Sequence, residues 1–149
     1  MTDEKTHRDL NESSPSVQAH LNILQNVIER MSSNSTSCKA WCIALVSAVL
    51  VIIADKEKPD LALLALIPTV LFLALDTYYL ALEKGFRNAY KSFVAKVHNG
   101  TLKADDLYSV APEGKPFNLH IAGLKSFSVW GFYSSLAVLI LVARSVVLS

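Results

Sequence analysis

Three long apolar segments constrain the fold of this chain of 149 residues more than any other feature. They cover residues 40–54, 61–82 and 127–149. The first has no charged residue, the second contains only Asp76 and the third only Arg144. A bilayer core about 30 Å thick needs about 20 helical residues to cross it. We therefore predict an all-α integral membrane protein with three transmembrane helices.

The charged residues, 18% of the chain, collect between the apolar segments. The formal net charge is only +1, so the chain lacks the basic surface that binds nucleic acid, and we expect no nucleic-acid partner. None of the common spacings of catalytic, phosphate-binding or metal-binding residues occurs in the sequence. We therefore expect no enzymatic activity, no cofactor and no metal site.

The basic residues are distributed unevenly between the two sides of the predicted spans. Eleven Lys and Arg residues precede the first span or separate the second from the third, against three elsewhere. Basic residues accumulate on the cytoplasmic side of membrane proteins. We predict a multi-pass protein of the cell inner membrane, with a cytoplasmic N-terminus and long connection and an outside C-terminus. The polar start has no cleavable signal pattern, so the first span is expected to direct insertion.

The N-terminal part of the chain divides into two regions. Residues 1–13 are polar, show no periodicity and are predicted to be disordered. Residues 14–38 are predicted to form a cytoplasmic amphipathic helix, because apolar residues recur at spacings of three and four from Val17 to Met31. The polar run at residues 32–37 either breaks this helix or lets it continue into the first span.

Residues 39–97 are predicted to form a tight transmembrane hairpin with a cytoplasmic helical extension. The loop at 55–60 joins the first two spans, and an apolar stripe continues beyond the second span to Val97. Folding the chain about residue 57 or 58 pairs this stripe with the amphipathic helix of residues 14–38. Residues 98–126 form a cytoplasmic connector, with a short helix near 101–108 and an interfacial segment at 117–124, before the third span at 127–149.

Asp76 is the first candidate for a functional side chain, because an ionisable group inside a span is costly and defaults to a functional hypothesis. The predicted hairpin places Lys39 opposite it. Two interpretations remain open at this point. Asp76 and Lys39 form a structural ion pair near the inner headgroups, or Asp76 binds a proton or a transported cation.

Small residues in the spans are candidates for close helix packing. On the first span Ala40, Ala44 and Ala48 form a strip that matches Ala65 and Thr69 on the second. On the third span Gly131 and Ser135 support helix association, either within the chain or between copies. Four basic residues that follow the second span are candidates for contact with an anionic ligand or anionic lipid, although a solvated helix face also explains them. They are Lys84, Arg87, Lys91 and Lys96.

Two stretches carry a resemblance to known proteins. They are NSTSCKAW at residues 34–41 and LALIPTVLFLALDTYYLALEKGFRNAY at residues 64–90, with the pattern D-x-Y-Y-L-x-x-E-K-x-F-R. Over residues 16–97 the chain resembles small bacterial inner-membrane proteins without assigned function, some of which look like membrane effectors of phage-defence operons. The resemblance implies a bacterial source and transfers no functional residue.

Three functions follow as hypotheses. The first is a small oligomeric, non-enzymatic effector or signalling component, of the phage-defence type, that perturbs the membrane in response to a cytoplasmic signal. The second is an ion channel or transporter subunit that uses Asp76, and the third is a membrane anchor or scaffold for a cytoplasmic partner. The expected partners are the lipid bilayer, further copies of the chain, and a cytoplasmic protein or small signalling ligand.

Overall fold

The computed structural model describes residues 10–56 and 59–147. Its elements, in chain order, are α1 (Pro15–Lys56), the 3-10 helix η1 (Pro59–Ala65), α2 (Leu66–His98), the 3-10 helix η2 (Ala104–Tyr108), α3 (Pro116–Leu124) and α4 (Phe127–Val147). No strand occurs among these residues, so the all-α prediction is confirmed for the described part of the chain.

Three helical stretches are long and apolar enough to cross a membrane, and they lie in α1, in η1 with α2, and in α4. The prediction of three such helices is therefore confirmed, and the chain has the architecture of a multi-pass membrane protein. Large apolar side chains on these stretches point outward. Val51 is 70% exposed, Val70 62% and Val146 67%. This is the arrangement that lipid-facing helices require, because lipid tails solvate apolar side chains.

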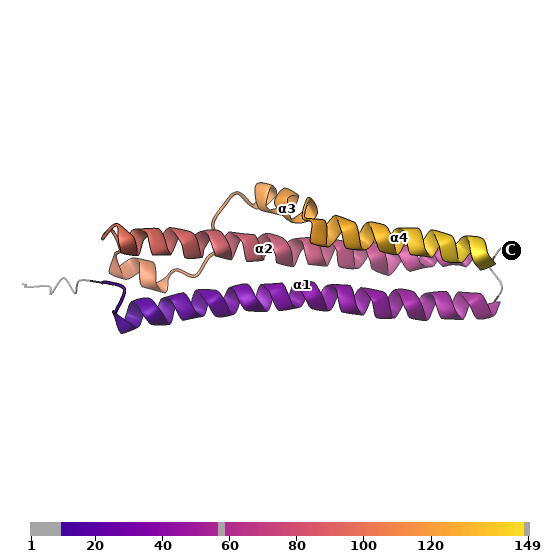
Figure 1. The fold of residues 1–149 in the computed structure, drawn as a ribbon, viewed down its shortest axis with the longest axis horizontal. Helices are drawn as coiled ribbons and strands as arrows, with labels where there is room; N and C mark the ends of the chain where they lie inside the picture. The colour runs from indigo at the N-terminus through magenta and orange to yellow at the C-terminus, as the bar shows by residue number, and fades with distance from the viewer. Residues whose placement is uncertain (1–9, 57–58, 148–149) are drawn as a thin grey trace, which may run out of the picture.

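The helices form an elongated bundle (Figure 1). The long helices α1 and α2 run antiparallel and side by side over their whole length, and α4 lies along one half of this pair. We call that half the membrane segment; it comprises residues 39–54, 61–76 and 127–147. The other half, residues 15–38 of α1 and 77–98 of α2, is the stalk. Residues 99–126 are the connector, which lies along the stalk and leads into α4.

The helix α1 continues without a break through the polar run at residues 32–37, which decides between the two predicted alternatives. Thr36 donates its hydroxyl hydrogen to the Ser32 carbonyl oxygen one turn earlier, at 3.2 Å, and Ser35 is buried against α2. A helix of 42 residues is about 60 Å long, whereas the bilayer core is about 30 Å thick. About half of α1 must therefore lie outside the hydrocarbon.

Two apolar clusters hold the bundle together. The stalk cluster comprises Val17, Leu24, Ala89 and Phe93, and the membrane cluster comprises Cys42, Val46, Ala65, Val129, Tyr133 and Ile140. In the stalk, burial of a large apolar side chain contributes about 1.5–3 kcal/mol relative to its exposure to water. In the membrane segment lipid competes for the same surface, so close packing replaces the hydrophobic effect as the source of stability.

The sequence explains where α2 begins and where it ends. Pro68 lies in the first turn of α2, where a proline is tolerated, and the change from 3-10 to α geometry comes just before it. At the other end, Gly100 has a φ of 65° and the N–H of Thr101 donates to the Lys96 carbonyl at 3.0 Å. This is a Schellman-type stop.

Parts of three predictions fall on residues outside the described ranges. These are the disordered N-terminus over residues 1–9, residues 57–58, about which the predicted hairpin folds, and residues 148–149 of the third span. Residues 10–14 form a turn, in which the N–H of Ser13 donates to Asn11 Oδ1 at 3.1 Å. The connector contains η2 near the predicted short helix, and a true helix, α3, where an interfacial segment was expected.

Candidate functional site

Asp76 and Lys39 form an ion pair across the seam between α1 and α2. Lys39 Nζ lies 2.6 Å from Asp76 Oδ2, and the Asp76 side chain is fully buried whereas that of Lys39 is 17% exposed. Ser35, one turn before Lys39, donates its hydroxyl hydrogen to Asp76 Oδ1 at 2.5 Å. Lys39 Nζ also donates to Ser35 Oγ at 3.2 Å. One helical face of α1 thus supplies both partners of the buried carboxylate.

The ion pair lies where the stalk meets the membrane segment. Trp41 of α1 and Trp130 of α4 are exposed at 64% and 53%, and Tyr78 follows Asp76 on α2 at 46%. Exposed aromatic residues of this kind favour the level of the lipid headgroups. The Lys39 chain can reach water from this level, which lowers the cost of keeping two charges there.

Tyr133 brings α4 to the same site. Its side chain is only 4% exposed, and its hydroxyl forms no hydrogen bond with any described residue although Asp76 is near enough to interact with it electrostatically. Thr69 is buried nearby on α2 and donates to the Ala65 carbonyl at 2.8 Å. Neither Ser35 nor Tyr133 was predicted from the sequence as part of this site. The spacing of four between Ser35 and Lys39 was a usable signal, whereas nothing in the sequence gave the rotation of α4.

The predicted small-residue strip on α1 does not face α2. Ala40, Ala44 and Ala48 are exposed, and the buried residues of this stretch are Cys38, Cys42 and Val46. The physical reason is the phase set by Ser35, which packs against Asp76. Residues three and seven positions after Ser35 share its face, so Cys38 and Cys42 meet α2 and the alanines turn away. On the opposing helix, Ala65 and Thr69 are buried at the contact, as expected of packing residues.

The second small-residue pair lies on the outer side of α4. Ser135 is exposed and donates its hydroxyl hydrogen to the Gly131 carbonyl at 2.8 Å. The ring of Phe127 covers Gly131, where an added Cβ would come within 3.2 Å of it. Within the chain, this pair therefore packs against its own helix, and Ser135 remains accessible to lipid or to another copy.

The four basic residues of α2 do not form one patch. Lys84 donates to the Ala122 carbonyl of α3, and Lys96 pairs with Asp106 of η2 at 2.9 Å. Arg87 donates through Nε to Glu83 on its own helix at 2.8 Å. Lys91 makes no ion pair with any residue that the structure describes, and it is exposed. Two of the four thus hold the connector, and only Arg87 and Lys91 still face an outside partner.

Hydrogen bonds to the backbone of Glu113 hold the connector against α2. The N–H of Glu113 donates to the Gly85 carbonyl at 3.0 Å, and Asn88 Nδ2 donates to the Glu113 carbonyl at 3.2 Å. This approach needs a glycine, because a Cβ on Gly85 would lie 2.6 Å from Pro112 Cβ. Gly123 of α3 also lies close to α2, since a Cβ at this position would lie 3.0 Å from the Thr77 carbonyl oxygen.

Contacts of His20 and Lys96 hold η2 against the stalk. The buried His20 donates through Nδ1 to the Leu107 carbonyl at 2.8 Å, and its ring lies 4.3 Å from that of Phe93. The hydrogen bond from Lys96, followed by that from the Lys103 backbone, holds the pKa of Asp106 below its usual range. The same bond raises the pKa of Lys96. At neutral pH both partners are therefore charged.

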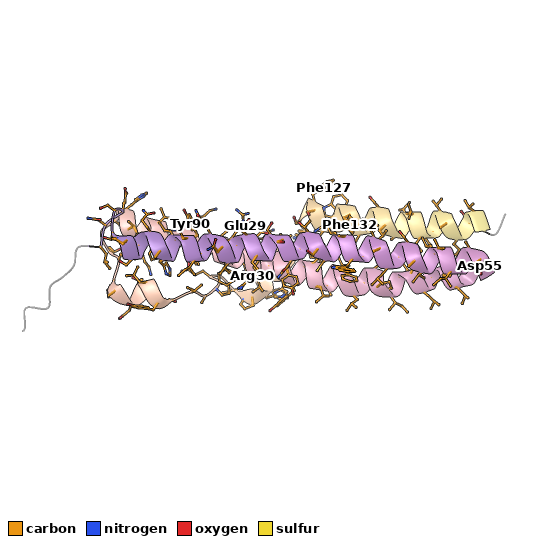
Figure 2. The ribbon with its side chains drawn as sticks, turned by 90° about the horizontal axis from the view of Figure 1, so that it is seen from below. Glu29, Arg30, Asp55, Tyr90, Phe127 and Phe132 are labelled. Atoms are coloured by element: carbon orange, nitrogen blue, oxygen red, sulfur yellow. The ribbon has the colours of Figure 1, made fainter. Side chains whose placement is uncertain are left out.

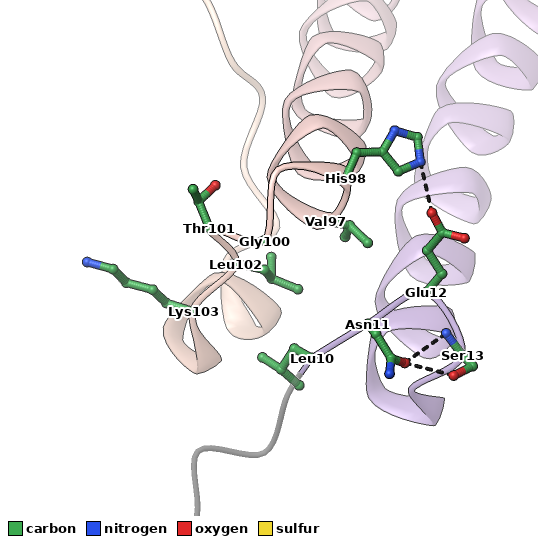
Figure 3. Close-up of a pocket in the computed structure, with 10 residues that line it drawn as sticks. All are labelled: Leu10, Asn11, Glu12, Ser13, Val97, His98, Gly100, Thr101, Leu102 and Lys103. Atoms are coloured by element: carbon green, nitrogen blue, oxygen red, sulfur yellow. Dashed lines mark hydrogen bonds and ion pairs between the residues drawn. The ribbon is translucent and has the colours of Figure 1, made fainter.

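The far tip of the stalk carries an open pocket of about 930 Å³, between the start of α1 and the end of α2 (Figure 3). Across it, Glu12 Oε1 lies 3.2 Å from His98 Nε2, and both side chains are well exposed. Leu10 and Leu102 supply its apolar lining. Such an exposed pair contributes little stability, and Leu10 and Leu102 hold the tip by packing against the stalk cluster.

The buried centre can hold charge and couple helices, and its chemistry is that of one carboxylate, one ammonium group and two hydroxyls. No three His, Cys, Asp or Glu side chains gather as a metal site within the described ranges. Comparison with models of known protein families, with curated protein sequences and with solved structures finds no match for this chain.

Proposed function

We propose that this chain is a small non-enzymatic membrane effector or signalling component, in which the stalk and connector receive a cytoplasmic signal and the membrane segment responds by perturbing the bilayer. One observation carries the proposal. Both α1 and α2 pass without interruption from the stalk into the membrane segment. Rigid helices transmit a displacement along their length, so movement of the stalk must move two spans. We place the stalk in the cytoplasm and the spans in a bacterial inner membrane.

The third span is coupled to the stalk in a different way. The connector is clasped to α2 at Gly85 and Lys84, and α4 begins at Phe127, three residues after α3 ends. A cytoplasmic ligand or protein that displaced the connector would therefore release the end of α4 at the membrane surface. Effectors of the phage-defence type are the setting that we propose for such a response, and several copies would act together, because three spans cannot enclose a wide polar path.

The contacts of Asp76 favour a structural role over ion transport. The Lys39 ammonium group already occupies the position that a transported cation would take, 2.6 Å from the carboxylate. A cation would have to displace both Lys39 and the Ser35 hydroxyl from a fully buried position. The pair therefore supports a fixed joint between the stalk and the membrane segment.

Inducible expression in bacteria with a potential-sensitive dye tests the effector function. Gly85→Val should push the connector off α2 and depolarise the membrane without any trigger, because it separates α4 from the stalk. Ala95→Val, at an exposed position of the same helix, serves as the matched control and should behave as the wild type. If Gly85→Val reaches the membrane in normal amounts and leaves potential and growth unchanged, the proposed function is wrong.

A further inference from the structure

The seam between α1 and α2 has two sides in the stalk, and only one of them is covered by residues that the structure describes. On one side η2 is held by His20 and Lys96. The other side is an open groove of about 610 Å³. Figure 2 shows Glu29 and Tyr90 along the edge of the stalk that lies away from η2. The groove is lined by Gln25, Ile28, Glu29 and Ser32 of α1 and by Arg87, Tyr90 and Lys91 of α2.

The lining residues form one stripe on each helix. On α1 they are spaced three, four and seven residues apart, and on α2 three and four apart. Residues at these spacings share one helical face, which is the pattern of a helix that packs against another helix. Ile28 and Tyr90 are half-buried at the floor of the groove, where Gln25 Nε2 donates to the Tyr90 hydroxyl at 3.3 Å. The charged side chains stand at the two rims.

The rims carry opposite charges at the same level. Gln25 pairs with Tyr90, and 14 residues later in α1 and 14 residues earlier in α2, Lys39 pairs with Asp76. The register between α1 and α2 is therefore constant through this stretch. It places Glu29 of α1 at the same level as Phe86 of α2, whose neighbour in the chain is Arg87. The α1 rim is acidic through Glu29, and the α2 rim is basic through Arg87 and Lys91.

We propose that this groove is the contact with a second copy of the chain, related by a two-fold axis that runs along the groove. Such an axis brings the α1 rim of one copy against the α2 rim of the other at the same level. Glu29 of each copy then meets Arg87 of its partner, and Ile28 and Tyr90 pack near the axis. The two stalks together form a four-helix bundle. The proposal rests on the oligomeric state included in the proposed function and names the surface that forms it.

The groove chemistry fits this partner. Arg87 donates only its Nε–H to Glu83. The guanidinium group has further N–H donors that can bind a second carboxylate. Lys91 and Glu29 make no ion pair with any residue that the structure describes, so both are available to the partner. A two-fold pair repeats each of these contacts, which makes the acidic and basic rims complementary to themselves.

The membrane segment sets the angle at which the copies meet. In Figure 2 α4 runs along the same edge of the bundle as Glu29 and Tyr90, further toward the membrane end. The two α4 helices therefore lie between the copies in the membrane segment, and each copy must lean so that the stalks approach. Membrane helices are tilted by about 20° on average, which allows such an approach.

Cysteine cross-linking of the full chain in native membranes tests this surface. Ile28→Cys puts one new, accessible thiol near the axis beside the two buried cysteines of the chain, and a covalent dimer through this thiol requires another copy. Asn26→Cys, exposed on α1 outside the groove, is the matched control, and the wild type reports the background from the buried Cys38 and Cys42. We expect several-fold more cross-linked dimer from Ile28→Cys than from Asn26→Cys. Added Glu29→Lys should lower this yield several-fold, and further addition of Arg87→Glu should restore it.

Three outcomes would overturn the inference. Equal cross-linking at Ile28→Cys and Asn26→Cys would show that the groove is not the contact. Undiminished cross-linking after Glu29→Lys would remove the charge argument. Absent cross-linking together with loss of co-purified anionic lipid in Lys91→Gln would assign the groove to a lipid. Normal cross-linking in a protein whose expression leaves the membrane potential unchanged would support this interface and reject the effector function instead.

Discussion

Lys39 and Asp76 face each other across the seam of α1 and α2, with Nζ 2.6 Å from Oδ2, at the level where the stalk enters the membrane segment. The two charges and the Ser35 hydroxyl form a polar joint inside an otherwise apolar contact. A buried ion pair adds little net stability, because desolvation offsets the attraction between the charges. Removal of only one of the two charged side chains is nevertheless destabilising, because the other charge remains without a partner.

Asp76→Ala should therefore destabilise the protein by about 3–5 kcal/mol, because it leaves the Lys39 ammonium group without its partner. The double variant Lys39→Met, Asp76→Leu removes both charges and should recover most of the loss. Unfolding followed by circular dichroism in mixed detergent micelles measures both. A single variant as stable as the wild type would mean that the joint is not formed in the folded protein.

Gly85→Val should loosen the connector by about 1–3 kcal/mol, the usual range for overpacking, since even a Cβ at this position would approach Pro112 to 2.6 Å. Limited proteolysis should then cut residues 109–115 faster than in the wild type. Ala95→Val changes an exposed small residue of the same helix and should leave the cleavage rate unchanged. Unaltered cleavage in Gly85→Val would contradict the close approach of connector and helix.

The clasp between Lys96 and Asp106 should weaken in acid. The hydrogen bond from Lys96 lowers the pKa of Asp106, so the carboxylate contributes stability above the ordinary aspartate pKa of about 4. That contribution is lost as the pH falls through the lower folded-state pKa. Hydrogen-exchange protection of residues 104–108 should decline over this range. Asp106→Asn should remove the pH dependence, and Asp105→Asn, at an exposed neighbour, should keep it.

Tyr133→Phe should change the unfolding free energy by less than about 1 kcal/mol, because the buried hydroxyl makes no hydrogen bond with any described residue. Tyr133→Ala should cost about 3–5 kcal/mol, since it opens a cavity where α4 meets the hairpin. The same unfolding measurement compares them. A large loss in Tyr133→Phe would reveal a hydrogen bond from the hydroxyl that holds α4 in place.

The sequence predicted the three apolar helices because length and composition suffice for that inference. The partner of Asp76 was also foreseen, since folding two spans about a short loop fixes which residues share a level. The continuity of α1 was left open, because the weak helix propensity of residues 32–37 competes with the burial of Ser35 against Asp76. Local propensity is a weak prior when tertiary packing acts on the same residues.

The rotation of each span was the part that the sequence could not supply. Where a helix is apolar all round, periodicity does not mark the buried face, and Ala40 and Ala44 were therefore assigned to the wrong side. The same limit hid the approach of Tyr133 to Asp76. In the stalk, by contrast, apolar residues alternate with polar ones along each helix, and Leu24 and Phe93 are buried in one cluster.

Reporter fusions test most directly the claim that the stalk and connector lie on the cytoplasmic side of three spans. Alkaline phosphatase, which is active only outside the cytoplasm, is fused after Ser149 and, in a second fusion, after Gly100. We expect high activity from the fusion after Ser149 and none from the fusion after Gly100, with both products retained in membranes after alkaline carbonate extraction. Equal activity at both positions, or release of the proteins by carbonate, would contradict the account.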